Sequence, residues 1–152
     1  MKIIQKHLPF CNRTILFMLI FVMPAFMAAS AEGAETPSAT PAHYYTATYF
    51  HGSFRCGTCQ RIETLSEKAI TNHFAQELKS GALVWRAVNV DEPENQHYVK
   101  DYSLFTKSLI ISEVKDGKEI RWKNLEKVWN FVRNEDKFDE YVLSEVKAWM
   151  GQ

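Results

Sequence analysis

The sequence predicts a single α/β domain in which a central mixed β-sheet is flanked by helices. Strand-like and helical patterns alternate between Tyr44 and Val90, which is typical of a βαβ unit. A tight turn at Asp116 and Gly117 then joins two further strands ahead of a helical tail. The 152 residues allow one such domain and leave little room for a second.

The first half of the domain follows from local patterns. Residues 44–50 are aromatic and β-branched, and they predict a strand. Residues 56–78 carry apolar side chains at helical spacing, and Gly81 is suited to the left-handed cap that ends such a helix. Residues 83–90 are almost continuously apolar, which predicts a strand that is covered on both faces.

The second half is predicted to hold a helix, a hairpin and a helical tail. Asp91 and Pro93 begin the helix, because proline is favoured in a first turn. Apolar residues at helical spacing define the tail. The predicted ranges are 91–102 for the helix, 109–114 and 119–122 for the hairpin strands, and 125–132 and 138–149 for the tail.

The composition is that of an ordinary globular protein. Hydrophobic residues make up 46% of the chain and charged residues 24%, which excludes a disordered, collagen-like or coiled-coil chain. Eighteen basic residues balance eighteen acidic residues, and they form no basic cluster. We therefore expect no nucleic-acid partner, because the chain has no basic field to attract phosphate.

Residues 1–31 have the layout of a secretory signal peptide. Basic residues precede an apolar run over 15–23, and Ala29-Ser30-Ala31 supplies the small residues that signal peptidase requires. The run is shorter than the roughly 20 residues of a membrane-spanning helix. We expect cleavage after Ala31 and export to the periplasm or extracellular space, with no stable membrane span after cleavage. An uncleaved membrane anchor is the alternative.

Residues 32–42 are predicted to form a disordered linker, because they contain two prolines and no large apolar side chain. The folded domain is then predicted to span residues 43–152. Cys11 leaves with the signal peptide, so Cys56 and Cys59 form the single possible cysteine pair. Export places that pair where disulfides can persist.

The chemistry is predicted at Cys56-Gly57-Thr58-Cys59, where the first strand runs into the first helix. A C-x-x-C pair at this junction is typical of a redox-active dithiol. Unpaired backbone N–H groups and the positive end of the helix dipole favour a thiolate there. We expect Cys56 to be the attacking thiol and Cys59 the buried resolving thiol. Arg55 adds a cation that also stabilises the thiolate.

A metal site and a purely structural disulfide remain alternatives for this cysteine pair. A structural zinc site needs four ligands, and no second cysteine pair follows residue 31. Met150 is the only methionine after that residue, so a thioether-rich copper site is lacking. A disulfide between residues three apart closes too small a loop to stabilise the fold much. We predict no bound metal and no organic cofactor.

The stretch from Tyr44 to Trp122 resembles the thioredoxin family. The Cys-Gly-Thr-Cys motif carries this resemblance, supported by the runs 88–91 and 115–118. The resemblance implies a thioredoxin-like fold and a thiol–disulfide oxidoreductase with a redox-active disulfide between Cys56 and Cys59. We expect a monomer. Its partner would be a protein thiol or disulfide client, or a membrane electron carrier. The competing class is a non-enzymatic accessory or metal-binding subunit with the same fold.

Two further runs, 106–108 and 122–125, are similar to a narrower group. These are small exported thioredoxin-fold proteins labelled as nitroreductase-subunit or arsenic-resistance-associated proteins. The label implies a thiol relay with a membrane electron carrier. Phe54, just before the motif, is predicted either to line a partner-docking surface or to pack in the core.

The sequence departs from the family pattern beside the cysteines. Thr106 or Lys107 stands where thioredoxins place a cis-proline, and we expect a trans loop because a non-proline cis bond costs ~2.5–4 kcal/mol. Lys107 either stabilises the thiolate or is an ordinary solvated lysine. Phe50 and His51 replace the buried acid near the end of the first strand, and Arg55 replaces an aromatic residue.

Overall fold

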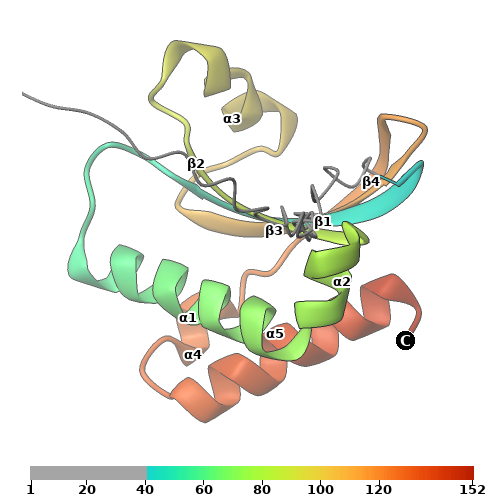
Figure 1. Ribbon diagram of the computed structural model, residues 1–152. Helices are drawn as coiled ribbons and strands as arrows, with labels where there is room; N and C mark the ends of the chain where they lie inside the picture. The colour runs from blue at the N-terminus through green and yellow to red at the C-terminus, as the bar shows by residue number, and fades with distance from the viewer. Residues whose placement is uncertain (1–40) are drawn as a thin grey trace, which may run out of the picture. The chain divides into compact units, whose positions relative to one another are not determined.

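The computed structural model describes residues 41–152 (Figure 1). The predicted signal peptide and nearly all of the predicted linker lie outside this range. The elements in chain order are β1 (His43–His51), α1 (Gly57–His73), α2 (Ala75–Ser80), β2 (Leu83–Asn89), the 3₁₀ helix η1 (Pro93–Asn95), α3 (His97–Asp101), β3 (Ser108–Lys115), β4 (Lys118–Asn124), α4 (Val128–Phe131) and α5 (Glu135–Met150).

The strands form a four-stranded mixed sheet in the order β2-β1-β3-β4. β1 runs parallel to β2 and antiparallel to β3, and β3 and β4 form an antiparallel hairpin. The sheet joins a βαβ unit, which contributes β1 and β2, to a ββα unit, which contributes β3 and β4. Strands β1 and β3 pair at its centre. This is the arrangement of a thioredoxin-like fold, and it confirms the predicted α/β class with a mixed sheet flanked by helices.

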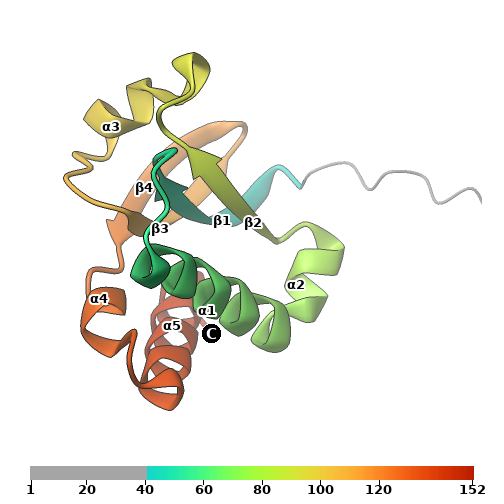
Figure 2. The same cartoon turned by 90° about the vertical axis from the view of Figure 1, so that its left-hand side faces the viewer.

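Helices cover the two faces of the sheet unequally. α1 and α5 lie along one face, whereas the short α3 lies on the other (Figures 1 and 2). The main core is between the sheet and the α1–α5 layer, where Tyr49 and Phe138 are both fully buried. Ala47 and Tyr49 of β1 belong to this core and alternate with Thr46 and Thr48, as the two-residue period of a strand requires.

Local sequence explains where several elements end. Gly81 closes α2 at φ +76°, in the left-handed region that glycine adopts without steric cost. Asp116 and Gly117 both have positive φ in the β3–β4 turn, as the predicted tight hairpin needs. At the start of α5, the side chain of Asn134 accepts a hydrogen bond from the backbone N–H of Lys137 at 3.0 Å.

Three predictions about the elements were wrong in detail. The helix predicted over 56–78 is divided at Phe74, whose ring is 1% exposed and packs in the core. β2 is an edge strand with Arg86 exposed, so it is not covered on both faces. The helix predicted over 91–102 is a 3₁₀ turn followed by the short α3. Burial of the Phe74 ring and the edge position of β2 are set by tertiary packing, which the local pattern does not contain.

Candidate functional site

A disulfide joins Cys56 and Cys59 at the N-terminus of α1. Cys56 is the N-cap of the helix, and its Sγ accepts a hydrogen bond from the backbone N–H of Cys59 at 3.1 Å. This sulfur therefore faces the N–H groups that a first helical turn leaves unpaired. Cys59 is 4% exposed, whereas Cys56 is partly exposed. Of the two sulfur-bearing residues, Cys56 is the more accessible to another molecule.

Tyr49 of β1 fixes the backbone of Cys59 through a hydrogen bond. The Tyr49 hydroxyl donates a buried hydrogen bond to the backbone carbonyl of Cys59 at 2.9 Å. Burial raises the pKa of Tyr49 to about 12, and the nearby positive charge of Arg55 acts in the opposite direction. Tyr49 is therefore a neutral hydrogen-bond donor at physiological pH, and it fixes the first turn of α1 to the sheet.

Arg55 lies immediately before the disulfide, but its guanidinium is directed to Glu63 on α1. Arg55 Nη2 and Glu63 Oε2 form an ion pair, and Arg55 Nη1 lies 3.4 Å from Nε2 of His51. The Nε of Arg55 is buried without a hydrogen-bond partner among the described residues. The cation that the sequence places next to Cys56 is thus shared with two other side chains.

The loop between β1 and α1 is anchored by the end of β2. Asp91 Oδ2 accepts a hydrogen bond from the backbone N–H of Ser53 at 2.7 Å, and Asn89 Nδ2 donates to Ser53 Oγ at 3.2 Å. A Cβ on Gly52 would lie 2.9 Å from Asp91 Oδ2, so glycine permits this close approach. The sequence indicated Asp91 as a helix start and as part of the run 88–91, but it did not predict this anchoring role.

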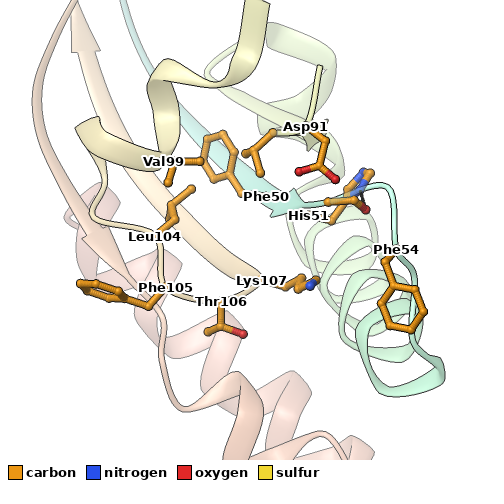
Figure 3. A pocket seen from close by; sticks show the side chains of 11 residues that line it. Phe50, His51, Phe54, Asp91, Val99, Leu104, Phe105, Thr106 and Lys107 are labelled. Carbon is orange, nitrogen blue, oxygen red and sulfur yellow. Dashed lines mark hydrogen bonds between the residues drawn. The ribbon is translucent and has the colours of Figure 1, made fainter. Parts of the chain in front are cut away.

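The loop with Thr106 and Lys107 has trans peptides, as expected, since the described residues contain no cis bond. The indole Nε1 of Trp129 on α4 donates to the Lys107 carbonyl at 2.9 Å, and Ser108 Oγ donates to the Thr106 carbonyl at 3.0 Å. The Lys107 side chain extends toward the side on which Phe54 lies (Figure 3). Among the described residues Lys107 forms no ion pair.

A cavity of about 200 Å³ lies between this loop, the β1–α1 loop, the end of β2 and α3 (Figure 3). Its apolar lining includes Phe50, Val99 and Leu104. Phe54 and Phe105 line its rim and are 77% and 97% exposed, so Phe54 does not pack in the core. Exposed aromatic side chains of this size offer apolar contact area to another molecule, and Phe54 precedes Cys56 by two residues.

The described residues contain no arrangement of three or more His, Cys, Asp or Glu side chains that could hold a metal ion. No helix within residues 41–152 is both long and apolar enough to span a membrane.

Comparisons with known proteins give distant likenesses only. No protein-family model and no curated protein matches the chain. Among solved structures, a malarial protein is 16% identical and is matched over 53% of this chain and 80% of its own. Thioredoxin from Fasciola hepatica is 20% identical and is matched over 64% of this chain and 81% of its own. The TM-score is 0.36 in both cases, and the narrower resemblance of runs 106–108 and 122–125 stays a prediction.

Proposed function

We propose that this protein is an exported thiol–disulfide oxidoreductase that cycles Cys56 and Cys59 between dithiol and disulfide. The observation that carries the proposal is the disulfide at the N-terminus of α1, in which one cysteine is partly exposed and the other is buried. A helix N-terminus favours the thiolate form of its capping cysteine. The asymmetry in exposure supports Cys56 as the attacking thiol and Cys59 as the resolving thiol.

In the reducing direction, the Cys56 thiolate attacks a client disulfide. A bond forms between Cys56 Sγ and one client sulfur, and the other client sulfur leaves as a thiolate that takes a proton from water. Cys59 then loses its proton to solvent and attacks Cys56 Sγ, which restores the disulfide and releases the second client thiolate. The client gains two electrons, and the protein loses two. The oxidising direction is the reverse sequence.

The cavity lined by Phe54, which precedes Cys56 by two residues, supports a protein client or a redox partner with an apolar contact surface. Phe54 and Phe105 provide exposed aromatic rings, and Lys107 adds a cation between them (Figure 3). We propose that a monomer docks either a protein client or a membrane or soluble electron carrier at this position. The narrower sequence resemblance favours a relay with a membrane electron carrier.

Trapping of mixed disulfides tests the proposed roles of the cysteines. Cys59→Ser removes the resolving thiol, so it is expected to accumulate mixed disulfides with partners, whereas Cys56→Ser is expected to trap far fewer. The protein is also expected to reduce insulin catalytically when a thiol reductant is supplied. Equal trapping by the two variants contradicts the assigned roles. Stoichiometric metal retention without catalysis indicates the metal-binding accessory alternative.

The export component of the proposal has its own test. If cleavage follows Ala31, the protein isolated from its native compartment begins at Glu32 and contains no Cys11. Its intact mass checks this expectation directly. A mature species that retains Cys11 contradicts the proposed cleavage.

A further inference from the structure

Arg55 and Glu63 form an ion pair that the sequence analysis did not anticipate. Glu63 follows Cys56 by seven residues, which is two turns or about 10 Å along the axis of an α-helix. The Arg55 side chain therefore extends from the loop along α1 to reach Glu63. No hydrogen bond joins the Arg55 guanidinium to either cysteine sulfur in residues 41–152. The cation adjacent in sequence to Cys56 is thus engaged elsewhere.

We propose that Glu63 controls the acidity of Cys56 by holding the Arg55 guanidinium along α1, and hence sets the redox balance of the cysteine pair. This inference rests on the proposed redox function and adds a positioning residue to it. Glu63 acts through Arg55, and it contacts no client.

Partial burial strengthens the electrostatic interaction between Arg55 and Glu63. The side chains of Arg55 and Glu63 are 29% and 21% exposed, so solvent screens their interaction less than it screens a fully exposed pair. His51 contacts the guanidinium from the end of β1 at 3.4–3.5 Å. Arg55 is therefore held between α1 and the end of β1, near enough to Tyr49 for its charge to act on the Tyr49 hydroxyl.

Loss of the Glu63 charge has two effects, and both of them stabilise the Cys56 thiolate. It removes an anion from the helix that carries Cys56, and it frees a guanidinium whose Nε has no acceptor among the described residues. Both changes favour the Cys56 thiolate. A more stable thiolate stabilises the reduced protein, so the reduction potential rises at pH values where Cys56 is ionised. A protonated Cys56 is neutral, so loss of the Glu63 charge stabilises it little.

The variant Glu63→Gln tests this inference against a matched control, Glu67→Gln. Both substitutions remove one negative charge from α1, but Glu67 is exposed and forms no ion pair within the described residues. All proteins are full-length and carry Cys11→Ser, so that only Cys56 and Cys59 react. The rate of iodoacetamide alkylation at Cys56 is followed against pH by peptide mass spectrometry. The dithiol–disulfide equilibrium is measured against glutathione.

We expect Glu63→Gln to increase the Cys56 thiolate fraction about threefold to tenfold at a pH below its pKa, and Glu67→Gln to change it far less. Glu63→Asp keeps the charge and is expected to stay close to the wild type. If the effect passes through Arg55, it shrinks in an Arg55→Gln background, which is the interaction that a double-mutant cycle measures.

The outcomes separate this inference from the proposed function. A wild-type protein that does not equilibrate with glutathione contradicts the redox function itself. A wild type that equilibrates, with Glu63→Gln indistinguishable from Glu67→Gln, overturns the role of Glu63. An undiminished effect in the Arg55→Gln background overturns the role of Arg55. If Glu63→Gln fails to fold, Arg55→Gln alone tests the inference. This variant removes the cation and leaves Glu63 unpaired, so it should slow the alkylation of Cys56. An unchanged alkylation rate overturns the inference.

Discussion

The two ends of β1 each carry an ionic cluster, but the clusters are built in opposite ways. At the start of β1, Glu113 from β3 is 4% exposed, and its carboxylate contacts one histidine and two cationic side chains. His43 Nε2 lies 2.8 Å and Lys115 Nζ 3.3 Å from its Oε1, and Arg121 pairs with its Oε2. At the end of β1, a single cation, Arg55, is shared by its neighbours.

The difference separates a structural cluster from a candidate reactive one. Arg121 also donates to the Trp149 carbonyl at 3.0 Å and lies 4.1 Å from the centre of the Trp149 ring. The Glu113 cluster thereby fastens β3 and β4 to the end of α5. The Arg55 cluster retains a buried donor without a partner and lies beside an accessible cysteine. The Glu113 carboxylate ties strands to a helix at one end of β1, whereas Arg55 at the other end is next to Cys56 in the chain.

The largest effect on stability is expected at the Glu113 cluster, at the start of β1. Glu113→Gln leaves Lys115 and Arg121 without their common anion, so we expect it to lower the melting temperature at about pH 7 more than Glu63→Gln does. The hydrogen bond from Arg121 holds the pKa of Glu113 below its ordinary value, and the contacts from His43 and Lys115 add to this effect. Thermal melts followed by circular dichroism at neutral pH make the comparison.

The same cluster predicts a pH dependence. A lowered folded-state pKa gives stability that is present above the unfolded value of about 4.3 and is lost as the pH falls through the folded value. The difference in melting temperature between wild type and Glu113→Gln should therefore shrink below about pH 4. A difference that stays constant down to pH 3 would contradict the role of the Glu113 charge.

The next largest effect concerns the hydrogen bond between the Tyr49 hydroxyl and the Cys59 carbonyl. Tyr49→Phe removes the donor to the Cys59 carbonyl and is expected to cost about 1 kcal/mol of unfolding free energy. Because the pKa of Tyr49 is raised to about 12, this loss should not vary between about pH 5 and pH 9. Urea denaturation measures it. Tyr45→Phe is the control, since the Tyr45 hydroxyl has no hydrogen bond among the described residues, and equal losses in both variants would count against the bond.

A smaller effect is expected from the loop that stands in place of the cis-proline. Trp129→Phe keeps an aromatic ring but removes the hydrogen bond to the Lys107 carbonyl, which is worth about 1 kcal/mol. We expect up to about fivefold slower exchange with a protein client and unchanged exchange with glutathione, which does not need a docking surface. Trp85→Phe on β2 is the control. Equal slowing with both substrates would show that the loop does not contribute to docking.

The smallest effect is expected from Lys107 itself. Lys107→Ala should raise the pKa of Cys56 slightly and lower the reduction potential, because a nearby ammonium favours the thiolate. The change should weaken in high salt, since a loop charge is screened within about 10 Å at 0.1 M. Alkylation of Cys56 against pH at two salt concentrations measures it, with Lys100→Ala on α3 as control. No difference between these variants would make Lys107 an ordinary solvated lysine.

The sequence alone determined the features that depend on neighbouring residues. The strand character of 44–50, the hairpin turn at Asp116 and Gly117, and the position of Cys56 at a strand–helix junction are all local patterns. Each was predicted correctly because backbone preference and side-chain periodicity act over a few residues. The topology followed from these elements, because few connections between two such units are allowed.

The tertiary structure decided the contacts that tune the site. Asp91 reaches Ser53 across 38 residues of chain, and the Trp129 indole reaches the Lys107 carbonyl across 22. No local pattern in the sequence pairs these residues with one another. Arg55 was correctly placed next to Cys56 by sequence, yet its guanidinium pairs with Glu63. Side-chain direction and charge pairing depend on which groups the folded chain brings within a few ångströms, and a linear sequence does not specify that distance.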